Sequence, residues 1–433
     1  MTHTLSRRNV LKGGAAMAAG ALALRPPRAA AQESVTITQV TSSDQVPYWQ
    51  FVNDQFKLEH PEVKFELIGV GYDQMLSRIV SQITSGAPLD IYALDIIWVG
   101  QFAGQGFTLP LDAELNAAER AAFLPGTLEG LQAGGKQVAL PAAAWFKNLF
   151  YNTELVQKMG LTKPPATYEA LVDACKAAEA NKVLARPTGW GFNQSEGMIC
   201  DWTLILHAFG GQWFDKSGGW AVNNDNGVAA LTYMVDNVKN AVFDPASTTF
   251  SDRDVMNPYL AGDYFAAAGW GLYGWSLANS ATDSKIVGKA DVGLLYGNAA
   301  AGTVSATCSG VSGIAINKDA PNKDLSVQWI RSFTGIGHRE NVQKAMDLSG
   351  MPPVQAWAWQ DPDLVGKNPA LPKLAEQAKY MFARPSANVA RYTEWSSMAQ
   401  IELSKALTGQ VAPKAALDTI VANGNRDFPG INF

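Results

Sequence analysis

The sequence predicts an α/β protein built of two lobes, and two observations support this. Strand-like and helix-like segments alternate three times between about residue 35 and residue 104. Such alternation forms a largely parallel sheet with right-handed crossovers. The 433 residues are also more than one hydrophobic core usually serves, so two domains are expected.

The three predicted strands cover residues 35–40, 63–68 and 89–94. The helix after the first strand is marked by an apolar face, and a second such helix ends at Gly86-Ala87-Pro88. These faces consist of Trp49, Val52 and Phe56 in the first helix, and Met75, Ile79 and Ile83 in the second. The stretch from Pro88 to Asp112 then supplies the third strand and its helix.

Asp95 stands where the third strand ends and the next helix begins, with Trp98 one turn on. Ligands of open α/β sheets bind at the carboxyl ends of the strands. A carboxylate beside an aromatic ring suits a polyhydroxylated ligand, because one binds hydroxyls and the other packs on the C–H face. On this stretch alone, a second interpretation stays open: Asp95 only caps the helix and Trp98 packs in the core.

The rest of the chain is expected to complete two lobes joined by strand-like crossings. Residues 142–147 are a plausible first crossing. Two lobes joined in this way suggest a cleft that closes by hinge motion. Further strands are expected near residues 138–141, 148–151, 190–193, 264–268, 291–295 and 311–316, and helices near 153–160, 168–181, 199–209, 226–240, 323–334, 338–347, 369–380, 395–408 and 413–422.

The N-terminal sequence predicts an export signal. Arg7-Arg8 with Leu11-Lys12 resembles the twin-arginine signal, and an Ala/Gly-rich apolar run follows from Gly13 to Leu24. That run is shorter than the ~20 residues a permanent membrane helix needs. Ala29-Ala30-Ala31 offers a cleavage site, so we expect residues 1–31 to be removed near Ala31 and the mature protein to be periplasmic.

Composition argues against several classes of function. A net charge of −5 with no basic stripe disfavours nucleic acid. Three scattered cysteines do not make a disulfide framework, although whether Cys175 and Cys200 pair stays open. The histidines are isolated, and neither H-E-x-x-H nor C-x-x-C occurs, so no metal and no cofactor are expected.

Two sequence patterns suggest other functions, nucleotide binding and glycoside hydrolysis. Gly269-x-Gly271-x-x-Gly274 matches the dinucleotide fingerprint, but the bulky Trp270 and Tyr273 stand where a pyrophosphate needs room. These glycines are better explained by an aromatic loop, whose rings project into a cleft or pack internally. Glycoside hydrolysis needs only two carboxylates, for which Glu196 and Asp201 are a candidate pair, but such a pair is expected by chance among 39 acidic residues.

Five segments along the chain are distinctive in sequence and in order. They are VTITQVTSSDQVPYWQFVNDQF, LDIIWVGQFAGQGFTLPLD, FYNTELVQKMGL, GVSGIAINKDAPNKDLSVQWIRSFT and the tail from Ala383 through SKALTGQVAPKAALDTI. Together they resemble the extracellular solute-binding proteins of sugar ABC importers, in the group of the maltose- and trehalose-binding proteins. The resemblance implies a periplasmic-binding-protein-like fold: two α/β lobes, a ligand cleft between them and a strand hinge. It also implies delivery of a sugar, oligosaccharide or polyol to ABC permease subunits, with no catalysis.

Carried over by position, the resemblance implies a set of ligand-binding residues. The first lobe would use the turn after the first strand and the acidic residue at the end of the third. Some aromatic positions differ from the family pattern, with Ala143 and Val311 at two of them. The sugar specificity of the family members is therefore not carried over to this chain. The implied residues are Asp44, Gln45, Asp95, Trp145, Trp270, Tyr273, Gly310 and Arg384.

The sequence therefore predicts a monomeric periplasmic solute-binding protein. Lobe 1 would comprise residues 33–141 plus about 282–330, and lobe 2 about 142–281 plus about 331–433. An exported glycoside hydrolase and a binding protein for a non-sugar solute remain the alternatives.

Overall fold

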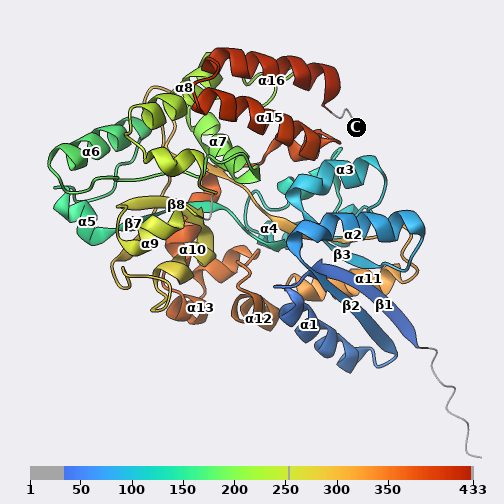
Figure 1. The fold of residues 1–433 in the computed structure, drawn as a ribbon. Coiled ribbons are helices and arrows are strands. Elements are labelled where there is room, and N and C mark those ends of the chain that lie inside the picture. Colours follow the sequence, from blue (N-terminus) through green and yellow to red (C-terminus); the bar gives the residue numbers. More distant parts are fainter. Residues whose placement is uncertain (1–33, 252–253, 431–433) are drawn as a thin grey trace, which may run out of the picture. The chain divides into compact units, whose positions relative to one another are not determined.

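The computed structural model describes residues 34–251 and 254–430, and in them two sheets carry helices on their faces (Figure 1). The predicted signal segment 1–31 lies outside the described residues. The mixed α/β, two-lobed architecture predicted from the sequence is confirmed.

The first sheet has five strands in the order β2-β1-β3-β11-β6. The three N-terminal strands pair in parallel, as predicted, whereas β11 runs antiparallel to both β3 and β6. The sheet is thus parallel only in its N-terminal half, because a strand from far along the chain returns into it. The strands are β1 (Val35–Ser42), β2 (Val63–Val70), β3 (Ile91–Asp95), β6 (Leu140–Ala143) and β11 (Ser312–Ile316).

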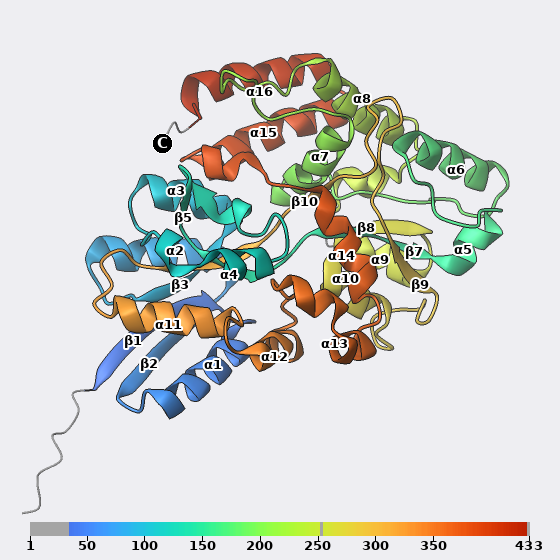
Figure 2. The same ribbon diagram turned by 180° about the vertical axis from the view of Figure 1, so that it is seen from behind.

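Helices cover both faces of this sheet. Figures 1 and 2 show α2 on one face and α11 on the other. The buried rings of Trp49 on α1 and Trp329 on α11 lie 4.9 Å apart between centroids, and α12 packs on α1. The helices are α1 (Val46–Glu59), α2 (Tyr72–Ser85), α3 (Val99–Gly104), α11 (Lys323–Phe333) and α12 (Arg339–Ser349).

The second sheet has three antiparallel strands in the order β8-β7-β9. A two-stranded parallel pair, β10 with β12, lies beside α7. The strands of the three-stranded sheet are β7 (Lys147–Asn152), β8 (Ala266–Trp270) and β9 (Ala290–Gly293). The two-stranded pair consists of β10 (Thr307–Cys308) and β12 (Met381–Phe382). Residues 290–293, which the predicted lobe 1 segment includes, thus pair with β7 in the second sheet.

Most of the remaining helices belong with this second sheet, and the C-terminal pair α15 and α16 packs on α7 and α8 (Figure 1). They are α5 (Thr153–Lys158), α6 (Tyr168–Ala180), α7 (Glu196–Ala208), α8 (Asp225–Lys239), α9 (Met256–Ala261), α10 (Gly271–Ala278), α13 (Pro362–Lys367), α14 (Leu371–Glu376), α15 (Tyr392–Leu407) and α16 (Pro413–Asp427). The short elements α4 (Ala117–Ala122), β4 (Gln132–Ala133) and β5 (Lys136–Gln137) connect β3 to β6.

One predicted strand is absent. Residues 190–193 form no sheet ladder. The amides of Trp190, Phe192 and Asn193 donate to the 245–250 turn, for example Phe192 N to Ser247 O at 2.9 Å. Trp190 and Phe192 are buried and their rings stack. The apolar pattern therefore came from core packing and not from strand pairing.

The C-terminal segment approaches α3 closely at a glycine. A Cβ atom placed on Gly100 would overlap the carbonyl oxygen of Ser386 and lie 3.0 Å from that of Val389. Backbone carbonyls cannot move aside as a flexible side chain can. Gly100 therefore allows the turn η7 (Pro385–Asn388) to pack directly on α3.

We expect Gly100→Ala to lower the free energy of unfolding by about 1–3 kcal/mol, the usual cost of overpacking. Gly104→Ala on the same helix is the matched control, because its Cβ would make an ordinary contact of 3.7 Å with Ala390. Thermal unfolding of the two variants checks this. Equal melting temperatures would show that η7 does not depend on a glycine here.

His207 is a buried titratable group on α7. Its ring stacks on Phe382 with centroids 4.1 Å apart and planes at 7°. Burial lowers the pKa of His207 to about 4, from its ordinary value of about 6.5. Between these two values the unfolded chain binds a proton that the folded protein does not.

Because the folded pKa lies below the unfolded one, His207 should reduce stability as the pH falls from about 6.5 to about 4, and no further below that. The loss approaches about 3 kcal/mol, at about 1.4 kcal/mol per pKa unit. His207→Phe keeps a ring against Phe382 and removes the proton. Urea unfolding at pH 7 and pH 5 should show a smaller difference for the variant than for the wild type, and equal differences would contradict the prediction.

Candidate functional site

The carboxyl end of β3 presents Asp95 as predicted. Its side chain accepts a hydrogen bond from Ile97 N at 3.1 Å, and so caps the 3₁₀ turn η1 (Ile96–Trp98) that precedes α3. Its second oxygen accepts from the Tyr72 hydroxyl at 2.8 Å. The capping interpretation of Asp95 is therefore confirmed, and the carboxylate still has acceptor positions for further donors.

Tyr72, and not Trp98, supplies an exposed aromatic ring beside Asp95. Trp98 is buried, whereas Tyr72 is 50% exposed and stacks on it, with centroids 5.9 Å apart and planes at 22°. Tyr72 opens α2 directly after β2, so it occupies the same kind of position as Asp95. The rule that identified Asp95, a side chain just past a strand end, would also have found Tyr72.

Asp44 and Gln45 follow β1 in the same way. Asp44 is exposed and Gln45 is half-buried at the start of α1, where its Oε1 accepts from the Thr41 hydroxyl at 3.2 Å. Because β1 and β3 are parallel neighbours, their following turns lie at the same edge of the sheet. The fold therefore brings Asp44, Gln45 and Asp95 to one edge.

Gly310 contacts two other predicted site residues, Trp145 and Trp270. Gly310 N donates to Trp145 O at 2.8 Å, and a Cβ on Gly310 would lie 2.7 Å from the ring of Trp270. Lys147 Nζ lies 5.4 Å from the centroid of the Trp270 ring. Trp145 and Trp270 are half-buried, so they form an aromatic group whose close packing requires a glycine at 310.

Tyr273 lies differently from these residues. It is 45% exposed and shares with Trp270 a pocket of about 240 Å³. No residue of the first sheet lines this pocket, so Tyr273 is placed with α9 and α10 and not with Asp44, Gln45 or Asp95. The other lining residues are Asp254, Met256, Asn257, Leu260, Gly274, Leu277 and Asp283.

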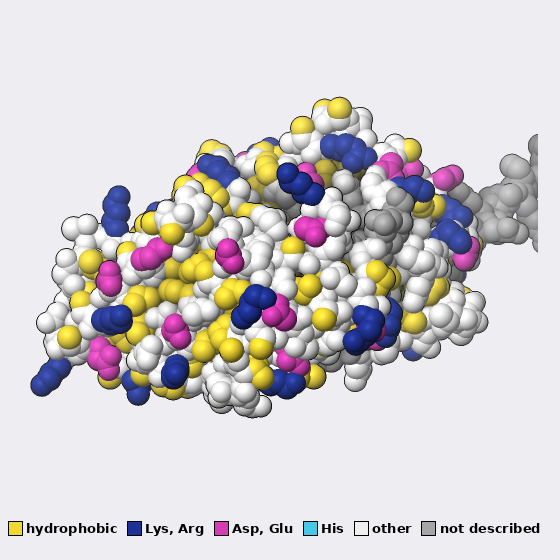
Figure 3. All heavy atoms as spheres, turned by 90° about the horizontal axis from the view of Figure 1, so that it is seen from above, with side chains coloured by type: hydrophobic (Ala, Val, Ile, Leu, Met, Phe, Trp, Pro, Cys, Tyr) yellow, Lys and Arg dark blue, Asp and Glu magenta, His cyan; other side chains and the backbone are white. Residues whose placement is uncertain are grey.

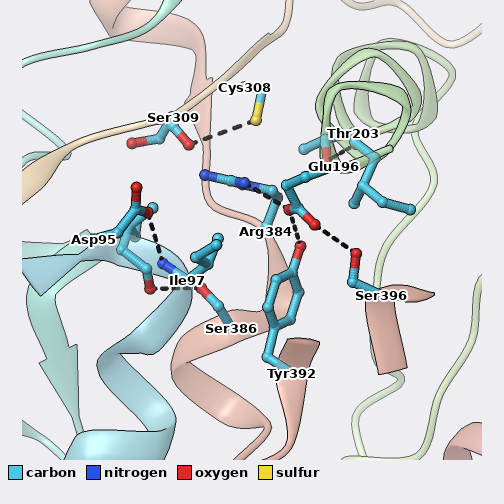
Figure 4. A network of polar contacts seen from close by, with 12 residues as sticks. Asp95, Ile97, Glu196, Thr203, Cys308, Ser309, Arg384, Ser386, Tyr392 and Ser396 are labelled. Carbon is cyan, nitrogen blue, oxygen red and sulfur yellow. Dashed lines mark hydrogen bonds and ion pairs between the residues drawn. The ribbon is translucent and has the colours of Figure 1, made fainter. Parts of the chain in front are cut away.

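Arg384 is buried in an ion pair that the sequence did not indicate. Its Nη1 lies 2.6 Å from Glu196 Oε1, and only 5% of Arg384 is exposed. The same carboxylate accepts from the Tyr392 hydroxyl and the Ser396 hydroxyl (Figure 4). Tyr392 and Ser396 are four residues apart on α15 and so share a face. Burial, followed by the Glu196 charge, raises the pKa of Tyr392 well above its ordinary value.

The Arg384 segment is tied to the edge that carries Asp95. Ser386 Oγ donates to Ile96 O at 2.9 Å, the carbonyl next to Asp95. Figure 4 shows the Arg384 guanidinium between the Asp95 and Glu196 carboxylates. One short segment thus joins the strand edge of the first sheet to the start of α7.

Glu196 and Asp201, the candidate carboxylate pair for hydrolysis, both bind other side chains. Asp201 is 1% exposed and pairs with the fully buried Lys147, with 2.5 Å between Oδ1 and Nζ, and it also accepts from Gly191 N at 3.0 Å. Glu196 binds three donors. A hydrolase would need both groups at the substrate, one to donate a proton and one to attack, and Asp201 is out of a substrate's reach.

The cysteines are all buried free thiols. Cys200 on α7 lies near Cys308 on β10, whose thiol donates to Ser309 O at 3.5 Å, whereas Cys175 lies on α6. The neighbour of Cys200 is therefore Cys308 and not Cys175, the partner considered from the sequence.

Other features of the described chain bear on function. In residues 34–251 and 254–430, no group of three His, Cys, Asp or Glu side chains could hold a metal ion. No described helix is long and apolar enough to cross a membrane. On the face seen in Figure 3, basic and acidic side chains are interspersed and neither forms a single-sign patch.

Comparison with known proteins gives consistent matches over most of the chain. A protein of Deinococcus radiodurans described as a probable ABC transporter-binding protein is 28% identical over 359 residues, which are 81% of each chain. The maltose-bound structure of T. maritima MalE3 is 27% identical, with a TM-score of 0.76 over 91% of this chain and 100% of that one. A solute-binding protein of Agrobacterium radiobacter K84 in complex with ribitol has the same fold, at 23% identity and a TM-score of 0.70 over 91% and 99% of the two chains.

The family profile of the bacterial extracellular solute-binding proteins matches residues 41–336. This span runs from the end of β1 through the whole second sheet to α11, and so includes both lobes. The chain belongs to the bacterial extracellular solute-binding protein family.

Proposed function

We propose that this chain is the substrate-binding component of an ABC importer and that it carries a sugar, oligosaccharide or polyol. The observation that supports a hydroxylated solute most directly is the pairing of Asp95 with Tyr72. A carboxylate with acceptor capacity stands beside an exposed aromatic ring. Hydroxyls would donate to the carboxylate, and the C–H face of the solute would pack on the ring.

The remaining contacts would come from both lobes. Asp44 and Gln45 lie at the same sheet edge as Asp95. The aromatic group of Trp145 and Trp270, closely packed on Gly310, would close on the opposite side of the solute. Tyr273 and Arg384 stay as proposed ligand contacts, although Arg384 would have to act from within its ion pair with Glu196.

The relatives support the same class of solute. One solved relative holds maltose and another ribitol. Ligand binding would draw the two lobes together by a hinge motion, and the closed form would dock on the permease. We propose a monomer that is exported through its twin-arginine segment and cleaved near Ala31. The lobe boundaries given above belong to the same proposal, except that residues 290–293 go with the second sheet, where they pair with β7.

A thermal-shift screen over sugars, oligosaccharides and polyols tests the class of solute. A true ligand at 100 times its dissociation constant stabilises the folded protein by about 2.7 kcal/mol. At least one carbohydrate should raise the melting temperature. A shift produced only by a polyamine or another non-sugar would reject the proposed class, and turnover of chromogenic glycosides would reject the binding role itself.

Asp95→Asn tests the carboxylate without removing the helix cap, since Asn is as good an N-cap as Asp. Sugar affinity should fall by at least about 1.5 kcal/mol, or about tenfold, the range for hydrogen bonds to charged groups. Asp95→Ala should lose at least as much affinity and some stability besides. Asp54→Asn, on the exposed side of α1, is the matched control. Calorimetry that finds equal affinity for all variants would remove Asp95 from the site.

Tyr72 can be divided into its ring and its hydroxyl. Tyr72→Ala should weaken sugar binding by about 1 kcal/mol or more through loss of the stacking surface. Tyr72→Phe should keep most of that surface and lose only the bond to Asp95. If the two variants bind sugar equally well, the ring does not contact the solute.

A further inference from the structure

The charges around Asp95 are unevenly matched. In the described chain Asp95 accepts hydrogen bonds from Tyr72 and Ile97 but takes part in no ion pair. The cation drawn nearest to it in Figure 4, Arg384, is bound to Glu196 instead. The second buried cation of this region, Lys147, is bound to Asp201.

Glu196 is built to hold Arg384. Its carboxylate accepts from the guanidinium, from Tyr392 and from Ser396, and these three donors come from two consecutive pieces of chain, the residues before η7 and the start of α15. Arg384 is buried, so its charge is weakly screened by solvent. A carboxylate placed on it therefore removes most of its attraction for any other anion.

The site carries two more negative than positive charges, counting Asp44, Asp95, Glu196 and Asp201 against Arg384 and Lys147. An acidic solute would meet the Asp95 carboxylate and find Arg384 already neutralised. Like charges brought together in an interface cost several kcal/mol, and specificity is often obtained by such unfavourable pairings. An uncharged polyol meets no such penalty, because its hydroxyls donate to Asp95.

We propose that Glu196 is a specificity-determining residue: by neutralising Arg384 it makes the site reject acidic sugars and accept their uncharged counterparts. This inference rests on the proposed function, because it concerns which solutes the same site admits. It assigns Glu196 a role through Arg384 and not through contact with the solute. Tyr392 and Ser396 position Glu196.

The experiment compares matched solutes that differ only in charge: glucose, glucuronate and glucosamine, and galactose, galacturonate and galactosamine. Calorimetric affinities are measured for the wild type, Glu196→Gln, Tyr392→Phe and Glu154→Gln. The last is the matched control, since Glu154 on α5 is an exposed glutamate that pairs with Lys158 and Lys289. Gln keeps the shape of Glu196 and its acceptor oxygen while it removes the charge.

The wild type should bind the neutral member of a pair at least about tenfold more tightly than the uronate, the equivalent of about 1.4 kcal/mol. Glu196→Gln should shift this ratio by at least about tenfold toward the uronate, and Glu154→Gln should leave it unchanged. Tyr392→Phe removes one donor to Glu196 but keeps its charge, so it should shift the ratio less than Glu196→Gln. A general loss of structure would weaken both members equally and so would not move the ratio.

Other outcomes overturn the inference in distinguishable ways. A wild type that prefers the uronate over the neutral sugar remains a sugar-binding protein, so only the role of Glu196 is rejected. If Glu196→Gln leaves the ratio of neutral-sugar to uronate affinity unchanged, the proposed role of Glu196 is also rejected. If no member of either set binds and no carbohydrate raises the melting temperature in the wider screen, the proposed function is rejected, and this inference is rejected with it.

Discussion

A buried guanidinium must be neutralised, and in this protein the Arg384–Glu196 pair meets that requirement across 188 residues of sequence. Moving one such ion out of water costs several kcal/mol even in real proteins, and only good geometry with additional hydrogen bonds offsets it. Tyr392 and Ser396 supply those bonds. The segment that carries Arg384 is thereby fixed to α7, and through Ser386 to the turn that Asp95 caps. This contact therefore links the strand edge, α7 and α15.

Much of the fold could be predicted from local pattern. The first three strands and their helices follow from apolar periodicity, and Asp95 follows from its place at a strand end. Local pattern failed at Trp190 and Phe192, which look like a strand but are buried by packing on the 245–250 turn. It also could not show that β11 enters the first sheet antiparallel, because pairing partners far apart in sequence leave no local signal.

The candidate site divides in the same way. Asp44, Gln45 and Asp95 share an edge because parallel strands end together, so the sequence carries that information. Trp145 and Gly310 came only from the family resemblance, whereas Trp270 also stood out in its glycine-flanked aromatic loop, and the structure places Gly310 against both tryptophans. Tyr72 was missed although its position after β2 is of the kind that identified Asp95. Glu196 was recognised as a carboxylate near aromatic residues, but its actual partners lie in the C-terminal segment and could not be read from its surroundings in sequence.

The position of β11 has a consequence for how the chain assembles. This strand lies between β3 and β6, so the first sheet stays divided until residues 312–316 reach it. All residues between β6 and β11, including the second sheet, must therefore be synthesised before β11 can pair with β3 and β6. Such non-local pairing slows folding and leaves strand edges open in the meantime. A truncated chain ending before residue 312 would therefore present two unpaired edges, and aggregation is the expected fate of such a fragment.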